Sequence, residues 1–123
     1  MARYLGKVVA VRGTTRMQRY SQVIGVKPEQ IASYEDIHQR VWPEVLEMIW
    51  TCNMRNYSIF RHDTLLFAYF EYVGDDFAAD MARMAADPKT REWWSVTEPM
   101  QDPVASRADG EWWKTLPEVF HCD

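Results

Sequence analysis

The sequence predicts a single domain of the α+β class, in which the elements follow the order strand, helix, strand, strand, helix, strand. Three observations predict it: an alternating run at residues 19–26, two β-rich runs joined by a short turn near residue 63, and helical spacing before and after that pair. A chain of 123 residues, 47% of them apolar, can bury the core of one such domain.

The folded domain is expected to extend from residue 17 to residue 123. Residues 1–16 have no clear period and contain four basic residues without an acidic one, so we expect a flexible basic N-terminal extension there. The first strand is predicted at residues 19–26, where alternate side chains share one face: Tyr20, Gln22, Ile24 and Val26.

Helical spacing follows this strand and is interrupted once. Pro28 suits a first helical turn, and apolar residues then recur every three or four positions as far as Asn53. Pro43 lacks an amide donor and restricts the backbone of Trp42 before it. We therefore expect a break at Trp42-Pro43 and a second helical piece that starts at Pro43.

Two antiparallel strands are predicted next, at residues 55–61 and 65–73, because Tyr, Phe, Ile and Leu are frequent in both. The residues between them, 62–64, form the predicted turn of a hairpin. Gly74-Asp75-Asp76 then provides a stop and an N-cap for a helix over 77–86.

A further helix and a short strand complete the order. Asp87-Pro88 is expected to begin the helix, which ends near Val96. Residues 99–110 are expected to form a loop, and residues 118–121 a last strand. The resulting β-α-β-β-α-β order is that of the ferredoxin-like fold.

A partner is expected to cover one face of the predicted sheet. Helices on one side of an antiparallel sheet leave its other side open, and strands this rich in aromatic residues would expose too much apolar surface there. Two copies packed across a twofold axis would cover that surface, so we predict a homodimer.

Composition excludes several classes of partner. Outside residues 1–16 the chain has 10 basic and 18 acidic residues, and a domain this acidic is a poor binder of nucleic acid. No apolar run reaches the roughly 18 residues of a membrane span, and Lys7 interrupts the only candidate signal-peptide region. Cys52 and Cys122 are too few for a disulfide framework. We expect a cytoplasmic protein with reduced thiols that binds neither nucleic acid nor membrane.

One predicted helix face carries three side chains suited to binding or chemistry. Tyr34, His38 and Trp42 are spaced at i, i+4 and i+8, so they share that face as far as the helix persists. A lone histidine on a helix is more often structural than catalytic, so this pattern alone is not specific. The three histidines lack an acidic ligand pattern, and no metal site is expected.

Paired tryptophans are a second candidate. Adjacent helical residues point about 100° apart, so Trp93 and Trp94 cannot both lie in one core layer, and one of them reaches a ligand site or a dimer contact. Tyr57, on a strand among aliphatic residues, is by itself a core residue. Trp112-Trp113, in the loop before the last strand, favours an interface or a lid.

Five short segments, taken together, resemble the L-rhamnose mutarotase family: Tyr34-x-x-x-His38-x-x-x-Trp42-Pro43-Glu44, Asn56-Tyr57-Ser58-Ile59, Leu66-Phe67-Ala68, Trp93-Trp94 and Glu118-Val119-Phe120. The resemblance extends from residue 17 to the end of the chain. It implies a dimeric ferredoxin-like α/β barrel without a cofactor. It also implies an isomerase of sugar catabolism that interconverts the α and β anomers of a free 6-deoxy-hexose.

By matched position, the resemblance implies that His38 is the proton donor and that four aromatic residues bind the sugar: Tyr34, Tyr57, Trp93 and Trp94. Two departures are residues 1–16 and a longer segment between Trp94 and the last strand. That segment and Tyr69-Phe70-Glu71-Tyr72 look like relatives assigned to L-fucose, so the resemblance leaves the sugar open between L-rhamnose and L-fucose.

The residues suit this reaction. Mutarotation requires a proton for the ring oxygen and a base for the proton of the anomeric hydroxyl, and a histidine with a pKa of about 6.5 serves either role at neutral pH. The second proton-transfer partner is open among a tyrosine, Glu71, a water molecule and His38 acting twice.

Two other functions compete with mutarotation. A small cofactor-independent monooxygenase has the same dimeric barrel with Trp and His in its pocket, and the fold alone does not separate the two. A non-catalytic sugar-binding module would have the same pocket but would not accelerate anomer exchange.

Overall fold

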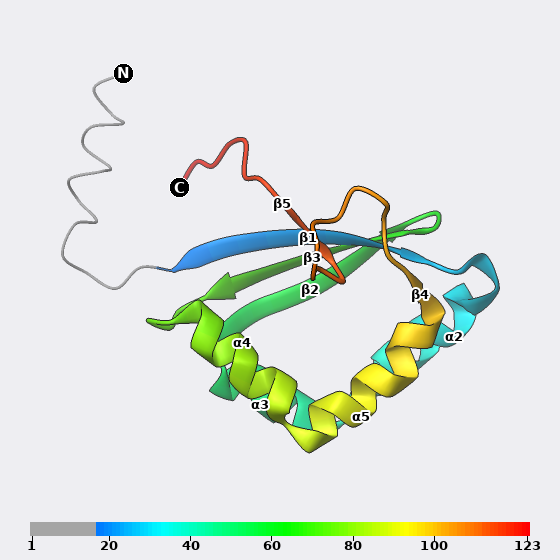
Figure 1. The fold of residues 1–123 in the computed structure, drawn as a ribbon, viewed down its shortest axis with the longest axis horizontal. Helices are drawn as coiled ribbons and strands as arrows, with labels where there is room; N and C mark the ends of the chain where they lie inside the picture. Colours follow the sequence, from blue (N-terminus) through cyan, green and yellow to red (C-terminus); the bar gives the residue numbers. More distant parts are fainter. Residues whose placement is uncertain (1–16) are drawn as a thin grey trace.

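The computed structural model describes residues 17–123 as a curled antiparallel sheet with helices along one face (Figure 1). Three long strands, β1 (Gln18–Val26), β2 (Met54–His62) and β3 (Leu65–Tyr72), lie in the order β2-β3-β1. Two short strands, β4 (Gln101–Asp102) and β5 (Lys114–Leu116), also pair with β1. The predicted α+β, ferredoxin-like class is confirmed. The extension predicted for residues 1–16 lies outside the described residues.

The alternating face predicted for the first strand is the face that the helices cover. Ile24 and Val26 are buried in one core cluster with Tyr34 and Leu66. Further along β1, the ring of Tyr20 stacks on that of Phe70, and the ring centroids are 5.2 Å apart. Gln22 lies between these apolar positions, so the alternation places a polar side chain under the helices.

The predicted break at Trp42-Pro43 is confirmed, but the first helix ends earlier than its apolar spacing indicates. A 3-10 turn (Pro28–Gln30) leads into α2 (Ile31–Ile37), and a second 3-10 turn, His38–Arg40, ends it. Trp42 is extended, with φ −62° and ψ 136°, as expected of a residue before proline. Pro43 then opens α3 (Pro43–Thr51).

The hairpin is confirmed and contains an irregularity that the sequence did not indicate. Asp63 in the turn has a φ of 51°, a left-handed conformation that aspartate tolerates. The β2–β3 register shifts between Arg55 and Ser58, and Asn56 has a φ of 51°. This bulge precedes Tyr57, whose ring contacts Phe70 on the helix-covered face at a centroid distance of 5.6 Å.

Both predicted helix caps are confirmed. Asp76 caps α4 (Phe77–Ala86) by accepting a hydrogen bond from the amide of Ala79 at 3.1 Å. Asp87 caps α5 (Pro88–Thr97) by accepting from the amide and the hydroxyl of Thr90, each at 2.9 Å. Each cap satisfies amides that the first helical turn leaves without a partner.

The segment after α5 differs from the prediction. The expected loop at residues 99–110 contains the end of a 3-10 turn, Glu98–Met100, and the short strand β4. The expected last strand at residues 118–121 is wrong, because the strand is β5, which ends just before Pro117. Proline removes the amide that would continue the ladder. Beyond it, Val119 and Phe120 are 92% and 76% exposed.

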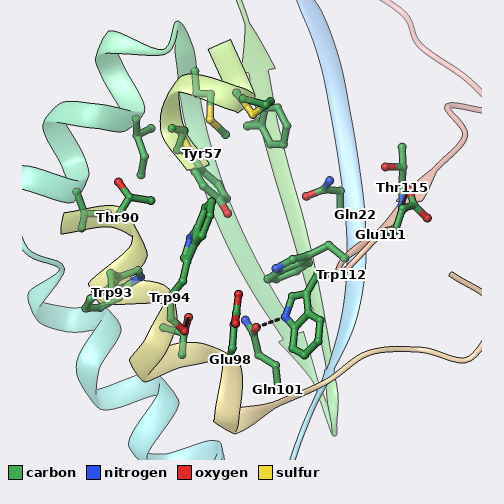
Figure 2. Close-up of a pocket in the computed structure, with 18 of the residues that line it drawn as sticks. Gln22, Tyr57, Thr90, Trp93, Trp94, Glu98, Gln101, Glu111, Trp112 and Thr115 are labelled. Atoms are coloured by element: carbon green, nitrogen blue, oxygen red, sulfur yellow. Dashed lines mark hydrogen bonds between the residues drawn. The ribbon is translucent and has the colours of Figure 1, made fainter. Parts of the chain in front are cut away.

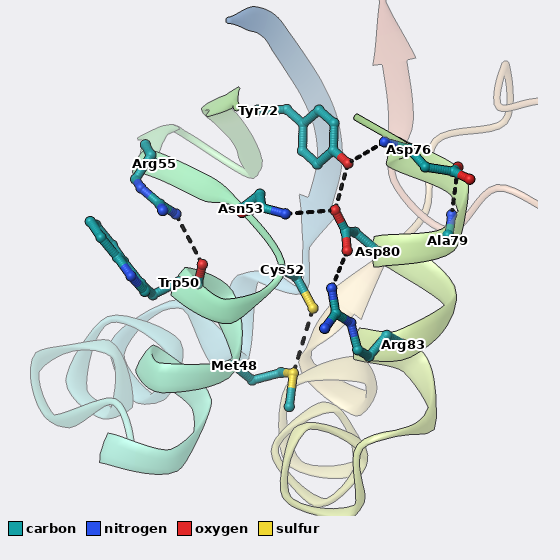
Figure 3. Close-up of polar contacts among 10 residues, drawn as sticks. All are labelled: Met48, Trp50, Cys52, Asn53, Arg55, Tyr72, Asp76, Ala79, Asp80 and Arg83. Atoms are coloured by element: carbon teal, nitrogen blue, oxygen red, sulfur yellow. Dashed lines mark hydrogen bonds and ion pairs between the residues drawn. The ribbon is translucent and has the colours of Figure 1, made fainter. Parts of the chain in front are cut away.

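A buried polar cluster fixes α4 to the end of β3 (Figure 3). The Asp80 carboxylate accepts hydrogen bonds from the hydroxyl of Tyr72 at 2.5 Å and the amide of Asn53 at 2.9 Å, and it pairs with Arg83. These partners, Tyr72 first, lower the pKa of Asp80 to about 2. Gly74 is required beside them, since a Cβ there would lie 2.4 Å from the Tyr72 hydroxyl.

Candidate active site

A cavity of about 390 Å³ lies between the sheet and the helices, and we call it the tryptophan cavity (Figure 2). Part of its wall is apolar and includes Met54, Phe70, Phe77 and Met84. Another part is polar and includes Gln22, Thr97, Glu98, Gln101, Glu111 and Thr115. Such a wall suits a small molecule that has both hydroxyl groups and an apolar surface.

A second cavity, of about 340 Å³, contains His38, and we call it the histidine cavity. It lies among α3, α5 and β2. Four residues line both cavities: Val45, Ile49, Tyr57 and Trp93. The two cavities are therefore neighbours, and these four residues form their common wall.

His38 is positioned by the end of α2, where the helix tightens. Its Nδ1 lies 2.7 Å from the backbone carbonyl of Tyr34. A carbonyl oxygen can only accept, so Nδ1 carries a proton and donates, which leaves Nε2 as the nitrogen that gains or loses a proton. Burial lowers the pKa of His38 below 6.5, against a smaller opposite effect of the Tyr34 carbonyl. The imidazole is therefore neutral at pH 7, and Nε2 has a free lone pair.

Aromatic side chains enclose the His38 ring. It stacks on the ring of Tyr34 at a centroid distance of 4.2 Å, and Trp93 meets it edge-on at 5.4 Å. Trp93 in turn meets Trp42 edge-on at 5.2 Å. Tyr34 and His38 therefore share a face, as predicted. Trp42 lies beyond the helix break, and it is Trp93 of α5 that contacts both Trp42 and His38.

The paired tryptophans both line the tryptophan cavity. Trp93 is buried, and Trp94 is half-buried beside the core cluster that contains Phe70 and Met84. At least one indole was expected to reach a surface other than the core. Both in fact reach the tryptophan cavity, which lies within this chain.

Tyr57 lies at the common wall of both cavities. The residue exposes 38% of its surface, but its hydroxyl is much more enclosed, and this desolvation raises the pKa of Tyr57 to about 12. Tyr34 adds a smaller effect in the same direction. The phenol therefore keeps its proton at any physiological pH and can donate it to a ligand.

Tyr34 lines neither of these two cavities. It is 3% exposed, and its hydroxyl accepts a hydrogen bond of 3.0 Å from Nε2 of Gln101. Gln101 lines the tryptophan cavity and was not predicted as a site residue. Gln22, Glu98 and Trp112 were also missed, although the alternation along β1 already placed Gln22 on the covered face.

The structure separates the remaining candidates from both cavities. Glu71 accepts hydrogen bonds from Asn56 and Tyr69 at 2.7 Å each and lines neither cavity. His62 is exposed at the end of β2, just before the hairpin turn, and His121 pairs with Asp123. Among residues 17–123, no group of three or more His, Cys, Asp and Glu side chains is arranged to hold a metal ion.

The fold and the site together define a small α+β domain of the ferredoxin-like barrel class, with a histidine beside a cavity that aromatic side chains line. The sequence profile of the L-rhamnose mutarotase family matches residues 19–122. The chain belongs to this family. The predicted family, the isomerase class and sugar anomer interconversion as its reaction type are confirmed, and the monooxygenase alternative is not favoured.

Named relatives include enzymes for two sugars. The chain is 34% identical to the L-rhamnose mutarotase of Opitutus terrae over 87% of this chain and all of that protein. It is 32% identical to the L-fucose mutarotase of Xanthomonas campestris over 85% of this chain and 87% of that protein. The crystal structure of an L-rhamnose mutarotase from Formosa agariphila has the same fold, with a TM-score of 0.67 and 22% identity over 86% of this chain and 99% of that one.

Proposed function

We propose that this protein interconverts the α and β anomers of a free 6-deoxy-hexose, L-rhamnose or L-fucose, and that His38 transfers the proton of the anomeric hydroxyl. The observation that carries the proposal is the free Nε2 of a neutral His38 in a cavity walled by Tyr57 and Trp93. The indoles of Trp93 and Trp94 provide apolar faces for the C–H groups of the sugar.

Ring opening begins with two proton transfers. Nε2 of His38 takes the proton of the anomeric hydroxyl, while a second group protonates the ring oxygen, so that the C1–O5 bond breaks and a C1=O1 aldehyde forms. Rotation about C1–C2 presents the other face of the aldehyde. Reclosure reverses the transfers, and His38 then acts as the proton donor.

For the second group we propose the hydroxyl of Tyr57. Of the side chains that line the histidine cavity, Tyr57 has the only hydroxyl. A pKa of about 12 keeps it protonated, and a sugar alkoxide is basic enough to take its proton. Glu71 lies elsewhere and does not serve. Tyr34 positions two residues of the site. Its carbonyl accepts a hydrogen bond from His38, and its hydroxyl accepts one from Gln101.

Magnetisation-exchange NMR on equilibrated L-rhamnose and on L-fucose, with catalytic amounts of protein, tests this proposal. Faster exchange between the anomer signals of one sugar is expected, and the ratio of the two rates identifies the preferred sugar. Sugar binding without faster exchange would support the non-catalytic module instead. Oxygen uptake with a catechol-like substrate would support the monooxygenase.

We also propose that the protein is a homodimer in the cytoplasm. Phe60, Phe67 and Val23 form a row across three strands on the face opposite the helices; Val23 is already buried, and Phe60 is 62% exposed. A second copy packed on this row would remove apolar surface from water. Light scattering at micromolar concentration that detects only a 14.5 kDa species would refute the dimer.

Cys52 and Cys122 are both free thiols, as a reducing compartment favours. No helix within residues 17–123 is long and apolar enough to cross a membrane.

A further inference from the structure

The side chain of Gln101 has hydrogen-bonding capacity that residues 17–123 leave unused. It is 5% exposed and lines the tryptophan cavity. A primary amide has two N–H donors and two acceptor lone pairs. One N–H donates to the Tyr34 hydroxyl at 3.0 Å, and one lone pair accepts from the indole of Trp112 at 2.7 Å. One donor and one acceptor therefore remain in a nearly buried group, where unmet hydrogen bonds are costly.

The orientation of this amide is fixed. The indole N–H of Trp112 can only donate, so the amide atom that faces it must be the oxygen, and the nitrogen must face Tyr34. Figure 2 shows the amide of Gln101 joined to Trp112 below the cavity. The sequence placed Trp112 in a lid or an interface. In the structure, it determines that the oxygen of the Gln101 amide faces Trp112 and the nitrogen faces Tyr34.

Pairing with β1 fixes the position of Gln101. Its backbone pairs with that of Val26, and Asp102 pairs with Gly25. The strands approach so closely there that a Cβ on Gly25 would lie 2.4 Å from the carbonyl oxygen of Asp102. Glycine at position 25 therefore permits the approach that brings Gln101 to the cavity wall.

We propose that Gln101 binds a sugar hydroxyl remote from the anomeric carbon and so determines which 6-deoxy-hexose the enzyme prefers. The proposal rests on the proposed function, in which the anomeric carbon lies beside His38. His38 lines the histidine cavity and Gln101 the tryptophan cavity, so a sugar at their common wall directs its C1 end and its other hydroxyls toward different residues.

The unused donor and acceptor suit this discrimination. L-Rhamnose and L-fucose differ in configuration at C2 and C4, so a fixed amide meets a hydroxyl in one sugar and a C–H group in the other. A buried amide that loses its partner disfavours the wrong sugar. The hydrogen bond from Trp112 prevents the amide from rotating by 180°, which would interchange its nitrogen and oxygen. Gln101 therefore cannot adapt to the hydroxyl arrangement of the other sugar.

The test combines variants with deoxy sugars. The kcat/KM for anomer exchange and the Kd, from tryptophan fluorescence, are measured for the preferred sugar and its 2-, 3- and 4-deoxy analogues. The proteins are wild type, Gln101→Ala and Trp112→Phe, with Gln30→Ala as the control. For wild type, either the 2-deoxy or the 4-deoxy analogue is expected to be worse than the parent sugar by roughly tenfold, the usual size for one buried hydrogen bond.

In Gln101→Ala that penalty should disappear for the same analogue, while the penalties for the other two remain. Trp112→Phe should reduce it partly, and this variant leaves Gln101 in place if Gln101→Ala does not fold. Gln30→Ala should retain every penalty. Wild-type penalties that persist for all three analogues in Trp112→Phe and in any folded Gln101→Ala would overturn the proposal.

The proposed function fails separately from this inference. Wild-type protein that binds the sugars without accelerating exchange would refute the catalytic proposal, and the ratios of Kd would still test Gln101. Wild-type exchange with unchanged penalties in the variants would refute the role of Gln101 alone. Absence of any binding by wild type would overturn both.

Discussion

Replacement of His38 by asparagine separates its chemistry from its structural role. The asparagine side-chain amide occupies the position of Nδ1, so His38→Asn keeps a donor for the Tyr34 carbonyl while it removes Nε2. His38→Ala removes both groups. If Nε2 transfers the proton, both variants should lose about 100- to 10,000-fold in exchange rate, the usual contribution of a positioned acid or base.

Stability should distinguish the two variants although activity does not. Both lose the ring contacts with Tyr34 and Trp93, worth roughly 1 kcal/mol. His38→Ala also loses the hydrogen bond to the Tyr34 carbonyl, about 1 kcal/mol more. Urea unfolding gives these differences, and NMR exchange on the same samples gives the rates.

Two results would refute the reasoning. Exchange by His38→Asn within about threefold of wild type would assign proton transfer to another group. Exchange far lower in His38→Ala than in His38→Asn would show that the hydrogen bond at Nδ1, rather than the free Nε2, supports activity.

Four further predictions concern pH, binding, stability and the N-terminus. Exchange by wild type should decline as pH falls through the pKa of His38, which burial holds below 6.5, because protonation removes the lone pair of Nε2; an NMR pH series that declines only above neutrality would contradict this. Trp94→Ala should raise KM more than it lowers kcat, since stacking acts on ground and transition states alike, and saturation kinetics measure the difference. The Asp80 cluster stabilises the fold above pH 3.8 and loses this effect as pH falls toward 2, so thermal unfolding of Asp80→Asn should show a lower Tm at pH 7 and a weaker dependence on pH in that window. Deletion of residues 1–16 should leave exchange and sugar binding intact, and loss of binding by a folded truncated protein would place that segment in the site.

The regular elements could be predicted from the sequence because local signals agree with tertiary packing. Proline at position 43 and aspartates at positions 76 and 87 act within one helical turn, and the structure confirms each of them. The last strand could not be predicted in this way. Residues 118–121 have the composition of a strand, but pairing with β1 uses residues 114–116, and only the tertiary register determines that choice.

The candidate site could be predicted in part for the same reason. Residue types and spacing made His38 and the paired tryptophans candidates, and only the family resemblance implied their roles. They could not show that a carbonyl fixes Nδ1 of His38, or that Gln101 stands between Tyr34 and the cavity. The first contact arises where α2 tightens into a 3-10 turn. The second depends on β4, a two-residue strand whose place is set by a close approach to Gly25 rather than by a pattern in its own residues.

The central position of β1 has a consequence for how the chain folds. The first strand of the domain finds its partners late in the sequence, since Gln18 pairs with Tyr72 and Ser21 with Leu116. During synthesis β1 therefore remains unpaired, with one largely apolar face, until the hairpin has left the ribosome. Such distant pairing predicts slow folding and a high contact order. The cavity wall that contains Gln101 and Trp112 closes only when almost the whole chain has emerged, so a truncated chain would lose the site before it loses the sheet.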